Sequence, residues 1–514
     1  MHWWNGRDLR RARTWDHALS ARYDLPWRAA QTPDAPALET RAGIWTFADL
    51  LDRARRGAAY ARAMAPEVEA PIGLLLDGDA EFAAWFHAIA LAGRTVLPLN
   101  LRLTTRELAQ QLVDAKVGWL LGKAGDARLA DLAAQVPGLR AEVVPRLDRL
   151  PATRGTMPEA GAGVDTSATL AVLFTSGTSG RAKGACLTWA NFVASAEAAA
   201  GRLGPVVAQR WLACMPLFHI GGLSILMRSV RFGGPARLLS RFDAAEVSDE
   251  LDSGEIAAVS LVPTMLSRLL AYRGERRAPP GLQVLLLGGA GAAPDLLTRA
   301  LAAGYPVCPT YGLTEACSQV ATAAPPPVGA ASPLPMRPLC GTELRIIHDG
   351  LDAPPGAPGE IVVRGPTVML GYLHDPQGTA RVLRDGWLHT GDIGCLDADG
   401  GLRMFDRRDD LIVSGGENVY PAEIEAVLLE HPAVDDAGVT GIPDADLGAR
   451  VIAWIVAAPG TAPDADSLRR HCRSRLAGFK QPREFRYVDA LPRNAVGKLQ
   501  RSRLGEHPAE TPAG

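Results

Sequence analysis

Short apolar segments alternate with helix-like stretches along most of this chain, up to about Leu339. Residues 72–76 form one such segment, helical periodicity follows over 80–92, and residues 95–99 form the next segment. Nearly continuous apolar strands separated by helices are typical of parallel sheets that are covered on both faces. Further strands are predicted at 117–121, 170–174, 211–215, 258–262 and 284–287. The pattern therefore predicts a mixed α/β fold with two doubly wound sheets.

The pattern changes after Leu339, and this change predicts the domain organisation. Segments 344–347, 360–364 and 402–405 alternate in polarity and are joined by Pro/Gly turns, which is typical of antiparallel strands. A charged cluster at 406–410 follows, and beyond it come a predicted helix, strand and helix at 421–429, 451–456 and 466–476. We predict a large N-terminal domain over 1–407, with a β-barrel-like region over 339–407, and a small mobile α+β domain over 408–514.

Composition excludes several classes of protein. The chain has 514 residues, and its 54 Lys and Arg residues are balanced by 56 Asp and Glu residues, whereas a nucleic-acid-binding protein usually has a basic excess. The seven cysteines are scattered without a C-x-x-C pair, which favours buried thiols over disulfides or zinc ligands. The N-terminus lacks the apolar core of a signal peptide, and no apolar run is long enough to span a membrane. We expect a cytoplasmic protein without nucleic-acid binding or stable membrane insertion.

A glycine-rich segment directly after the predicted strand 170–174 points to phosphate binding. Residues 175–184 read TSGTSGRAKG, with three glycines and four hydroxyl residues. Glycine lets the backbone approach an anion closely, the hydroxyls donate hydrogen bonds, and Arg181 and Lys183 add positive charge. Gly184 follows the lysine where the common nucleotide-binding loop requires Ser or Thr. Taken alone, the segment is also compatible with a flexible linker.

Further polar motifs follow other predicted strands, at the sheet edge where open α/β folds bind ligands. At Tyr311-Gly312-Leu313-Thr314-Glu315, the tyrosine can stack on a base, the threonine can contact a phosphate and the glutamate can hold Mg²⁺. The alternative is a helix N-terminus with Thr314 as its cap. The other motifs are 287–291, a glycine-rich turn, 390–392, whose aspartate can accept ribose hydroxyls, and Gly497-Lys498 near the C-terminus.

Together, these motifs resemble the adenylate-forming superfamily of acyl-CoA synthetases, amino-acid adenylation domains and luciferases. The resemblance extends from about Arg28 to Arg503, and the motifs occur in the family's order and spacing. It implies that ATP and a carboxylate form an acyl-adenylate and pyrophosphate, after which a thiol, usually that of coenzyme A, displaces AMP. Ala182 departs from the family pattern, which usually has proline before the lysine, and we expect the activity to survive this change.

The resemblance also implies roles for residues in the first half-reaction. Lys498 would bridge the carboxylate and the α-phosphate, Thr314 would contact the α-phosphate, and Glu315 would hold Mg²⁺. The residues implied for the β- and γ-phosphates are Thr175, Ser176, Gly177, Thr178, Ser179, Gly180 and Lys183. Those implied for the adenosine are Gly289, Ala290 and Tyr311 around the adenine, and Asp392 and Arg407 at the ribose.

For the second half-reaction, the resemblance implies a rotation of the small domain. Asp409 matches the hinge position, and the turn containing Gly415 and Gly416 is similar to the loop that lines the pantetheine tunnel. ATP, Mg²⁺ and coenzyme A are therefore the expected cofactors and co-substrates, and a carboxylic acid is the expected partner. A homo-oligomeric state stays open.

The acyl substrate is predicted from residues 215–228. His219 matches the aromatic gate beside the reacting carboxylate, with a buried core histidine as the alternative. Arg228 is a lone cation in an apolar helix-like run, where a second substrate carboxylate could pair with it, or where it could point to the surface. This segment, with 311–320 and 415–421, resembles the o-succinylbenzoate–CoA ligases of menaquinone biosynthesis. The candidate substrate-binding residues are His219, Ser224, Arg228, Gly289 and Ser318.

Other functions compete with this hypothesis. The nearest is a CoA ligase for a medium- or long-chain fatty acid or a plain aromatic acid. A second is an adenylation enzyme that loads a carrier-protein thiol. An inactive relative kept as a binding protein is less favoured, because Lys498, Glu315 and Asp392 are all present. Luciferase-type oxygen chemistry is the most remote.

Overall fold

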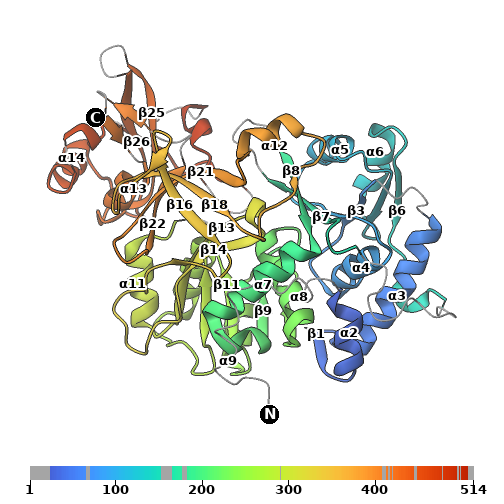
Figure 1. The fold of residues 1–514 in the computed structure, drawn as a ribbon. Coiled ribbons are helices and arrows are strands. Elements are labelled where there is room, and N and C mark those ends of the chain that lie inside the picture. The colour runs from blue at the N-terminus through green and yellow to red at the C-terminus, as the bar shows by residue number, and fades with distance from the viewer. Residues whose placement is uncertain are drawn as a thin grey trace. The chain divides into compact units, whose positions relative to one another are not determined.

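The computed structural model describes residues 23–64, 70–151, 165–175, 182–289, 291–407, 412–414, 417–419, 421–444, 448–476, 478–494, 497 and 499–506. The chain forms two compact units, which Figure 1 shows as a ribbon. Unit 1 comprises Met1–Gly289, Ala300–Leu344 and Val363–His389. Unit 2 comprises Ala290–Arg299, Arg345–Val362 and Thr390–Gly514.

The first sheet of unit 1 contains seven described strands in the order β19-β8-β7-β4-β3-β5-β6. Strands β7, β4, β3 and β5 run parallel, as predicted, and β6, which was not predicted, is also parallel. Strand β8 is antiparallel to β7, and β19 is antiparallel to β8. The bounds are β3 Ile72–Leu75, β4 Val96–Pro98, β5 Trp119–Gly122, β6 Arg140–Val143, β7 Thr169–Thr175, β8 Lys183–Thr188 and β19 Gly371–Tyr372. Because β7 and β8 are antiparallel partners, the two ends of the glycine-rich segment lie beside each other.

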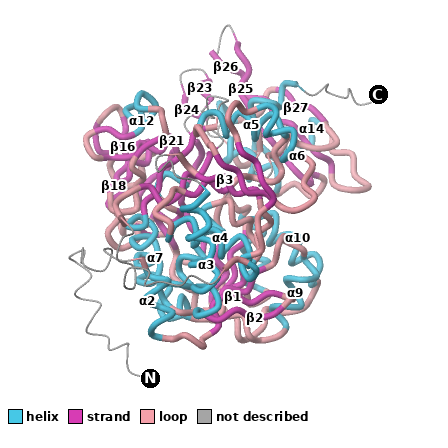
Figure 2. The backbone as a smooth tube through the Cα atoms, turned by 90° about the vertical axis from the view of Figure 1, so that its right-hand side faces the viewer, coloured by secondary structure: helices cyan, strands magenta, loops and turns pink. Residues whose placement is uncertain are grey.

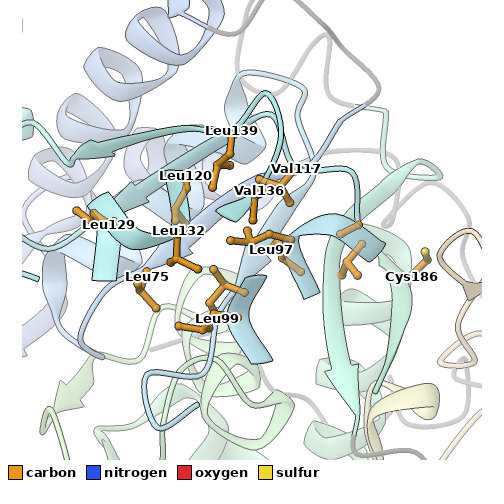
Figure 3. Close-up of a cluster of buried hydrophobic side chains, with 14 residues drawn as sticks. Leu75, Leu97, Leu99, Val117, Leu120, Leu129, Leu132, Val136, Leu139 and Cys186 are labelled. Carbon is orange, nitrogen blue, oxygen red and sulfur yellow. The ribbon is translucent and has the colours of Figure 1, made fainter. Parts of the chain in front are cut away.

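Helices α5 (Thr105–Asp114) and α6 (Arg128–Gln135) cover one face of this sheet. Their leucines pack with strand residues such as Leu75 and Leu120 in the buried cluster of Figure 3. Side chains alternate along a strand, so Leu121, which is also fully buried, points to the opposite face. Both faces of the sheet are therefore covered, as expected for near-continuous apolar strands. Helix α4 (Ala80–Leu91) contacts β3, β4 and helix α3 (Phe47–Met64).

The second sheet of unit 1 contains nine described strands in the order β15-β14-β13-β12-β11-β9-β10-β1-β2. Its centre, from β13 to β1, is parallel, and β14, β15 and β2 are antiparallel additions at the edges. Figure 2 shows β1 and β2 at one such edge. The bounds are β1 Pro36–Thr40, β2 Gly43–Thr46, β9 Trp211–Ala213, β10 Ala236–Leu238, β11 Ala258–Leu261, β12 Val284–Leu287, β13 Val307–Leu313, β14 Ser318–Thr322 and β15 Arg337–Pro338.

Helix α8 (Ile220–Phe232) lies against this second sheet, in contact with β9, β10 and β14 and with helix α7 (Trp189–Leu203). A side chain at Gly222 would collide with the backbone of Pro216, so the start of α8 can lie close to the preceding turn only because this residue is glycine. Gly233, with φ of 83°, ends the helix in the left-handed region. The remaining described helices of eight or more residues are α2 Asp24–Gln31, α9 Ala244–Asp252, α10 Pro263–Arg273 and α11 Pro294–Ala302.

Unit 2 contains most of the antiparallel region predicted after Leu339. This sheet has the strand order β17-β16-β18-β21-β20, and β22 pairs with β21. Its bounds are β16 Glu343–His348, β17 Leu351–Asp352, β18 Gly359–Arg364, β20 Leu383–Arg384, β21 Trp387–Leu396 and β22 Leu402–Arg407. The three strands predicted here, at 344–347, 360–364 and 402–405, are confirmed as β16, β18 and β22.

The C-terminal part of unit 2 is built on strands β23 Ile412–Ser414, β24 Glu417–Val419, β25 Val434–Asp444, β26 Gly448–Ala457 and β27 Glu484–Tyr487. Helices α13 (Pro421–Leu429) and α14 (Ala465–Arg473) pack on one face of β26, where Val451, Ala453 and Ile455 are buried. The alternate residues Ile452 and Trp454 pack on the other face with Leu491 and Leu504. This α+β arrangement has the helix–strand–helix order that the sequence predicts.

The cysteines and helices also test two expectations from composition. The described structure contains no disulfide between the seven cysteines, and all except the exposed Cys340 are buried, which confirms the prediction of buried thiols for these six. Among the described residues, no helix combines the length and the apolar character that crossing a bilayer would require.

Candidate active site

The glycine-rich segment connects two paired strands of the first sheet. Thr175 ends β7 and Lys183 begins β8, and the two residues are antiparallel partners. The intervening candidates Ser176, Gly177, Thr178, Ser179 and Gly180 lie outside the described residues. The structure therefore places both ends of the predicted phosphate loop at one position on the sheet edge.

Glu315 lies beside this position, in the 3₁₀ helix η5 (Thr314–Ala316). The Thr175 hydroxyl donates a hydrogen bond to Glu315 Oε1 at 3.3 Å, although 140 residues separate them. The Tyr372 hydroxyl donates to the same oxygen at 2.9 Å. Sequence reasoning missed Tyr372, which stands 57 residues after Glu315 and carries no local signal of a site.

The Glu315 carboxylate is suited to a magnesium ion that is bound mainly by substrate phosphates. Among the residues that the structure describes, only Oε1 accepts hydrogen bonds, and Oε2 has no partner. In the same described part of the chain, no group of three or more His, Cys, Asp or Glu residues could hold a metal by itself. A single carboxylate together with phosphate oxygens and water is a usual ligand set for Mg²⁺.

Lys183 brings positive charge to the cluster formed by Thr175, Glu315 and Tyr372. Its Nζ atom lies 5.0 Å from the centroid of the Tyr372 ring and 4.0 Å from Asp375 Oδ2. Tyr372 therefore contacts two of the residues predicted to surround the ATP phosphates and magnesium. Its strand β19 is paired with β8, which carries Lys183.

The backbone around Thr314 and Tyr311 is tightly constrained. A side chain at Gly312 would overlap the carbonyl oxygen of Ser318, so only glycine fits there. Cys317 and Ser318 have φ values of 50° and 93°, and the Ser195 hydroxyl donates to the Cys317 carbonyl at 2.6 Å. Thr314 begins η5, and the capping position belongs to Leu313, which makes no side-chain cap. Thr314 therefore does not have the helix-capping role that was its alternative.

The candidates for adenosine lie in both units. In unit 1, Tyr311 is buried on β13, and Gly289 follows β12 with φ of 83°, a conformation that favours glycine. In unit 2, Asp392 and Arg407 are antiparallel partners on β21 and β22. The Thr390 hydroxyl accepts a hydrogen bond from the Asp392 backbone N–H at 3.1 Å, which shapes the turn that carries the aspartate.

Helix α8 carries three of the acyl-site candidates. His219 is its N-terminal cap residue, and burial, aided by the charge of Arg102, lowers the pKa of His219 to about 4. The ring is therefore neutral at pH 7. Ser224 and Arg228 are four residues apart and share one face of the helix. The Ser224 hydroxyl donates to the Gly221 carbonyl at 3.1 Å.

Arg228 is buried, with 2% of its surface exposed, so it does not point to solvent. Its Nη1 donates to Gln319 Oε1 at 3.3 Å, and its Cζ lies 4.4 Å from the centroid of the Trp211 ring. Its Nε and Nη2 are buried without a hydrogen-bond partner in the described structure. Burial lowers the pKa of Arg228 to about 10, which leaves the guanidinium charged at pH 7. Gln319 and Trp211 are functional candidates that sequence reasoning did not single out.

Several other candidates fall where the structure gives no description. Lys498, Asp409, Gly415, Gly416 and Ala290 lie outside the described residues. Their predicted roles stay predictions. Gly497, which precedes Lys498, is described, with φ of 82°, and its carbonyl accepts a hydrogen bond from Arg493 at 2.8 Å.

Comparison with known proteins identifies relatives over nearly the whole chain. The chain is 42% identical over 492 residues to a 2-succinylbenzoate–CoA ligase of Geobacillus kaustophilus, an alignment that covers 93% of this chain and 96% of that protein. It is similar to the solved structure of o-succinylbenzoate CoA synthetase from Bacillus subtilis in complex with the acyl-adenylate intermediate OSB-AMP. That match has a TM-score of 0.87 and 37% identity, and it covers 95% of this chain and 99% of the other.

A second structure of the Bacillus subtilis synthetase, in complex with ATP and magnesium ion, matches with a TM-score of 0.84 and 37% identity over 94% of this chain and 98% of the other. The family model of AMP-binding enzymes matches residues 25–373, and the model of their C-terminal domain matches 423–498. The first match alone covers more than half of the chain, and the resemblance inferred from the motifs is confirmed. This chain therefore belongs to the AMP-binding enzyme family.

Proposed function

We propose that this protein joins 2-succinylbenzoate to coenzyme A at the expense of ATP. The succinyl carboxylate attacks the α-phosphorus of ATP, which forms acyl-adenylate and releases pyrophosphate. The thiol of coenzyme A then attacks the acyl carbon, gives up its proton, forms the thioester and releases AMP. The observation that carries the proposal is the buried Arg228 on α8, considered with the relationship to 2-succinylbenzoate–CoA ligases.

Arg228 suits an acid that has a second carboxylate. In a guanidinium, the N–H of Nε and one N–H of Nη2 point the same way, and together they form the edge that a carboxylate grips in two parallel hydrogen bonds. This is the edge that has no partner among the described residues. A fatty acid leaves such a buried cation without compensation, whereas the ring carboxylate of 2-succinylbenzoate supplies both charge and acceptors.

His219 complements Arg228 by being uncharged. Since the pKa of His219 is lowered to about 4, its imidazole is neutral at physiological pH. It therefore does not attract the benzoate carboxylate of the substrate away from Arg228. We assign His219 to the reacting end of the acid, where a neutral ring can pack and exchange hydrogen bonds. Ser224, Gly289 and Ser318 complete the proposed acyl site.

For the adenylation step, we assign the β- and γ-phosphates to the segment from Thr175 to Lys183 and the α-phosphate to Thr314 and Lys498. Two anions approach each other in this step, so cations and donors must neutralise the transition state. Glu315 would hold Mg²⁺ through Oε2, and the ion, when bound, offsets phosphate charge. Tyr311, Gly289 and Ala290 would flank the adenine, and Asp392 and Arg407 would bind the ribose.

For the thioester step, we propose that the chain bends at Asp409, between an N-terminal domain ending at Arg407 and a C-terminal domain beginning at Arg408. Gly415 and Gly416 would then line the passage for the pantetheine arm. Support comes from the separation of the two family matches, which end at 373 and begin at 423. We also infer a cytoplasmic location, whereas the sequence leaves a homo-oligomeric state open.

Thioester formation by the purified protein tests this proposal. ATP, Mg²⁺ and coenzyme A would be combined with 2-succinylbenzoate, 4-oxo-4-phenylbutanoate, benzoate, or medium- and long-chain fatty acids. We expect a strong preference for 2-succinylbenzoate over 4-oxo-4-phenylbutanoate, which differs only by lacking the ring carboxylate. Lys498→Ala should lose adenylation but still form thioester from supplied acyl-adenylate. Preference for a monoacid would keep the family chemistry and refute the substrate.

A further inference from the structure

Arg228 is held by two neighbours that leave one side of its guanidinium available. Gln319 Oε1 accepts a hydrogen bond from Nη1 at 3.3 Å, and Cζ lies over the Trp211 ring at 4.4 Å from the ring centroid. Nε and Nη2 have no partner in the part of the chain that the structure describes. The neighbours are thus arranged around the edge to which a carboxylate binds.

The amide of Gln319 has only one orientation that satisfies its surroundings. Its Nε2 donates to Thr322 Oγ1 at 2.9 Å, and Thr322 Oγ1 lies 2.7 Å from Thr310 Oγ1. Thr310 lies within hydrogen-bond distance of the Ala321 carbonyl at 3.3 Å, and either hydroxyl of the Thr310–Thr322 pair can be the donor. Rotating the Gln319 amide by 180° would set its NH₂ against Nη1, so that two donors would face each other.

The Trp211 ring is similarly fixed. Its Nε1 donates to the Ser260 hydroxyl at 3.0 Å, and both residues are buried in the second sheet of unit 1. A ring held in this way presents its face to the guanidinium and attracts the cation without accepting a hydrogen bond from it. The contact with Trp211 therefore leaves the N–H groups of Nε and Nη2 without a hydrogen-bond partner among the residues that the structure describes.

Among the described residues, no anionic side chain pairs with Arg228. No ion pair to Arg228 occurs among the described residues, and its nearby Cys317 is a buried thiol. Burial raises the pKa of Cys317, so the thiol stays neutral at pH 7. Within the described part of the chain, the cation is consequently oriented by neutral groups, and no anionic side chain there neutralises its charge.

We propose that Gln319 and Trp211 are positioning residues that hold Arg228 with its Nε and Nη2 edge toward the acyl site, and that they thereby set the preference for acids with a second carboxylate. This inference rests on the proposed function. Neither residue touches the reacting atoms in this assignment. They act on the substrate through Arg228, so their effect on acid preference should disappear when Arg228 is replaced.

The test compares the kcat/KM for 2-succinylbenzoate with that for 4-oxo-4-phenylbutanoate. Gln319→Met keeps the volume but removes the acceptor for Nη1, and we expect the ratio to fall by about 10-fold, mainly through KM. Gln319→Glu keeps the shape and pairs with Arg228, so it should lower the ratio by partly neutralising the charge.

Trp211→Leu should lower the ratio by about 5-fold, and Trp211→Phe, which keeps a ring face, by less.

Two controls separate positioning from general damage. Gln283→Met makes the same chemical change in an exposed glutamine that is paired with Gln209, and it should leave the ratio unchanged. In an Arg228→Met background, adding Gln319→Met should change the ratio by less than about 2-fold, because the residue through which Gln319 acts is gone.

The outcomes distinguish this inference from the proposed function. A wild-type enzyme that does not prefer 2-succinylbenzoate refutes both. A wild-type enzyme with that preference, combined with Gln319 variants that weaken both acids equally, would leave the function standing and overturn the positioning role. Additive effects of Gln319→Met and Arg228→Met on the ratio would also overturn it.

Discussion

In unit 1, the proposed phosphate side, around Glu315, and the proposed acyl side, around Arg228, differ in how their charged groups are partnered. Around Glu315, the charged and polar side chains contact one another: Thr175 and Tyr372 donate to the carboxylate, and Lys183 lies over the Tyr372 ring. Arg228, in contrast, is buried among neutral groups with two nitrogens unpartnered in the described structure. A site for ATP and Mg²⁺ receives ligands of both charges, whereas a site for a second carboxylate needs one uncompensated cation.

The difference matters for specificity. A polar group whose hydrogen bonds are already made within the protein discriminates weakly between ligands, because ligand binding only exchanges one hydrogen-bond partner for another. A buried polar group that only the correct ligand satisfies penalises every ligand that lacks the matching group. The comparison therefore predicts that mutations on the phosphate side change the rate for all acids, and mutations around Arg228 change the choice of acid.

The largest effect is expected for Glu315→Gln. The amide keeps the shape of the side chain but removes the negative charge that favours Mg²⁺, and the adenylation rate should fall on the order of 10²–10³-fold. Because the loss is on the phosphate side, the ratio between 2-succinylbenzoate and 4-oxo-4-phenylbutanoate should not change. Pyrophosphate release with each acid measures both quantities, and a changed ratio would contradict the separation of the two sides.

Arg228→Met should give the opposite result. Losing a two-bond, charge-assisted contact should reduce the preference for 2-succinylbenzoate over 4-oxo-4-phenylbutanoate by about 10- to 100-fold, through KM of the diacid. The dependence of the rate on Mg²⁺ concentration should stay as in the wild type. An unchanged KM for 2-succinylbenzoate would remove Arg228 from the acyl site.

The same Arg228→Met variant should be more stable than the wild type. A buried cation without an anionic partner has a desolvation cost, and an apolar side chain of similar length removes it. We expect the free energy of unfolding to rise by about 1–3 kcal/mol. Urea unfolding without ligands measures this, with Arg276→Met, a change at an exposed arginine, as the control. A loss of stability would indicate that Arg228 serves the fold instead of the substrate.

Tyr372→Phe should have a smaller effect, confined to the phosphate side. Among the described residues, removing the hydroxyl leaves Glu315 Oε1 with the longer hydrogen bond from Thr175 alone. Losing such a supporting contact should raise the Mg²⁺ concentration needed for half-maximal adenylation by about 10-fold. The phenyl ring still covers Lys183. If the magnesium requirement is unchanged but the acid preference shifts, the hydroxyl supports the acyl side instead.

The smallest effect is expected from His219 on changing pH. With a pKa of about 4, only about one His219 ring in a hundred is protonated at pH 6, so Arg228 is the charged residue among the acyl-site candidates of α8 at this pH. The ratio of kcat/KM for the two acids should change by less than about 2-fold between pH 6 and pH 8. A preference for the diacid that rises as pH falls to 6, and disappears in His219→Phe, would show that His219 carries charge there.

Much of the fold could be predicted because local patterns report it directly. Segments 72–76 and 284–287 are apolar on both alternating faces, and this requires cover on both sides of a sheet. The antiparallel additions to these sheets were not predicted. β19 has only two residues, Gly371–Tyr372, and its place beside β8 depends on a contact with a strand nearly two hundred positions earlier.

The sequence alone determined the class of chemistry, because phosphate-binding loops and strand-end motifs are local: glycines, hydroxyls and charges must stand together in the chain to shape one turn. It also determined that Arg228 is an isolated cation in an apolar run. Only the tertiary structure decided which way Arg228 points, because a helix can turn any of its faces to the core, and here α8 packs against β9, β14 and α7. The partners Gln319, Trp211 and Tyr372 were likewise decided by packing, since each contact joins residues that are remote in sequence.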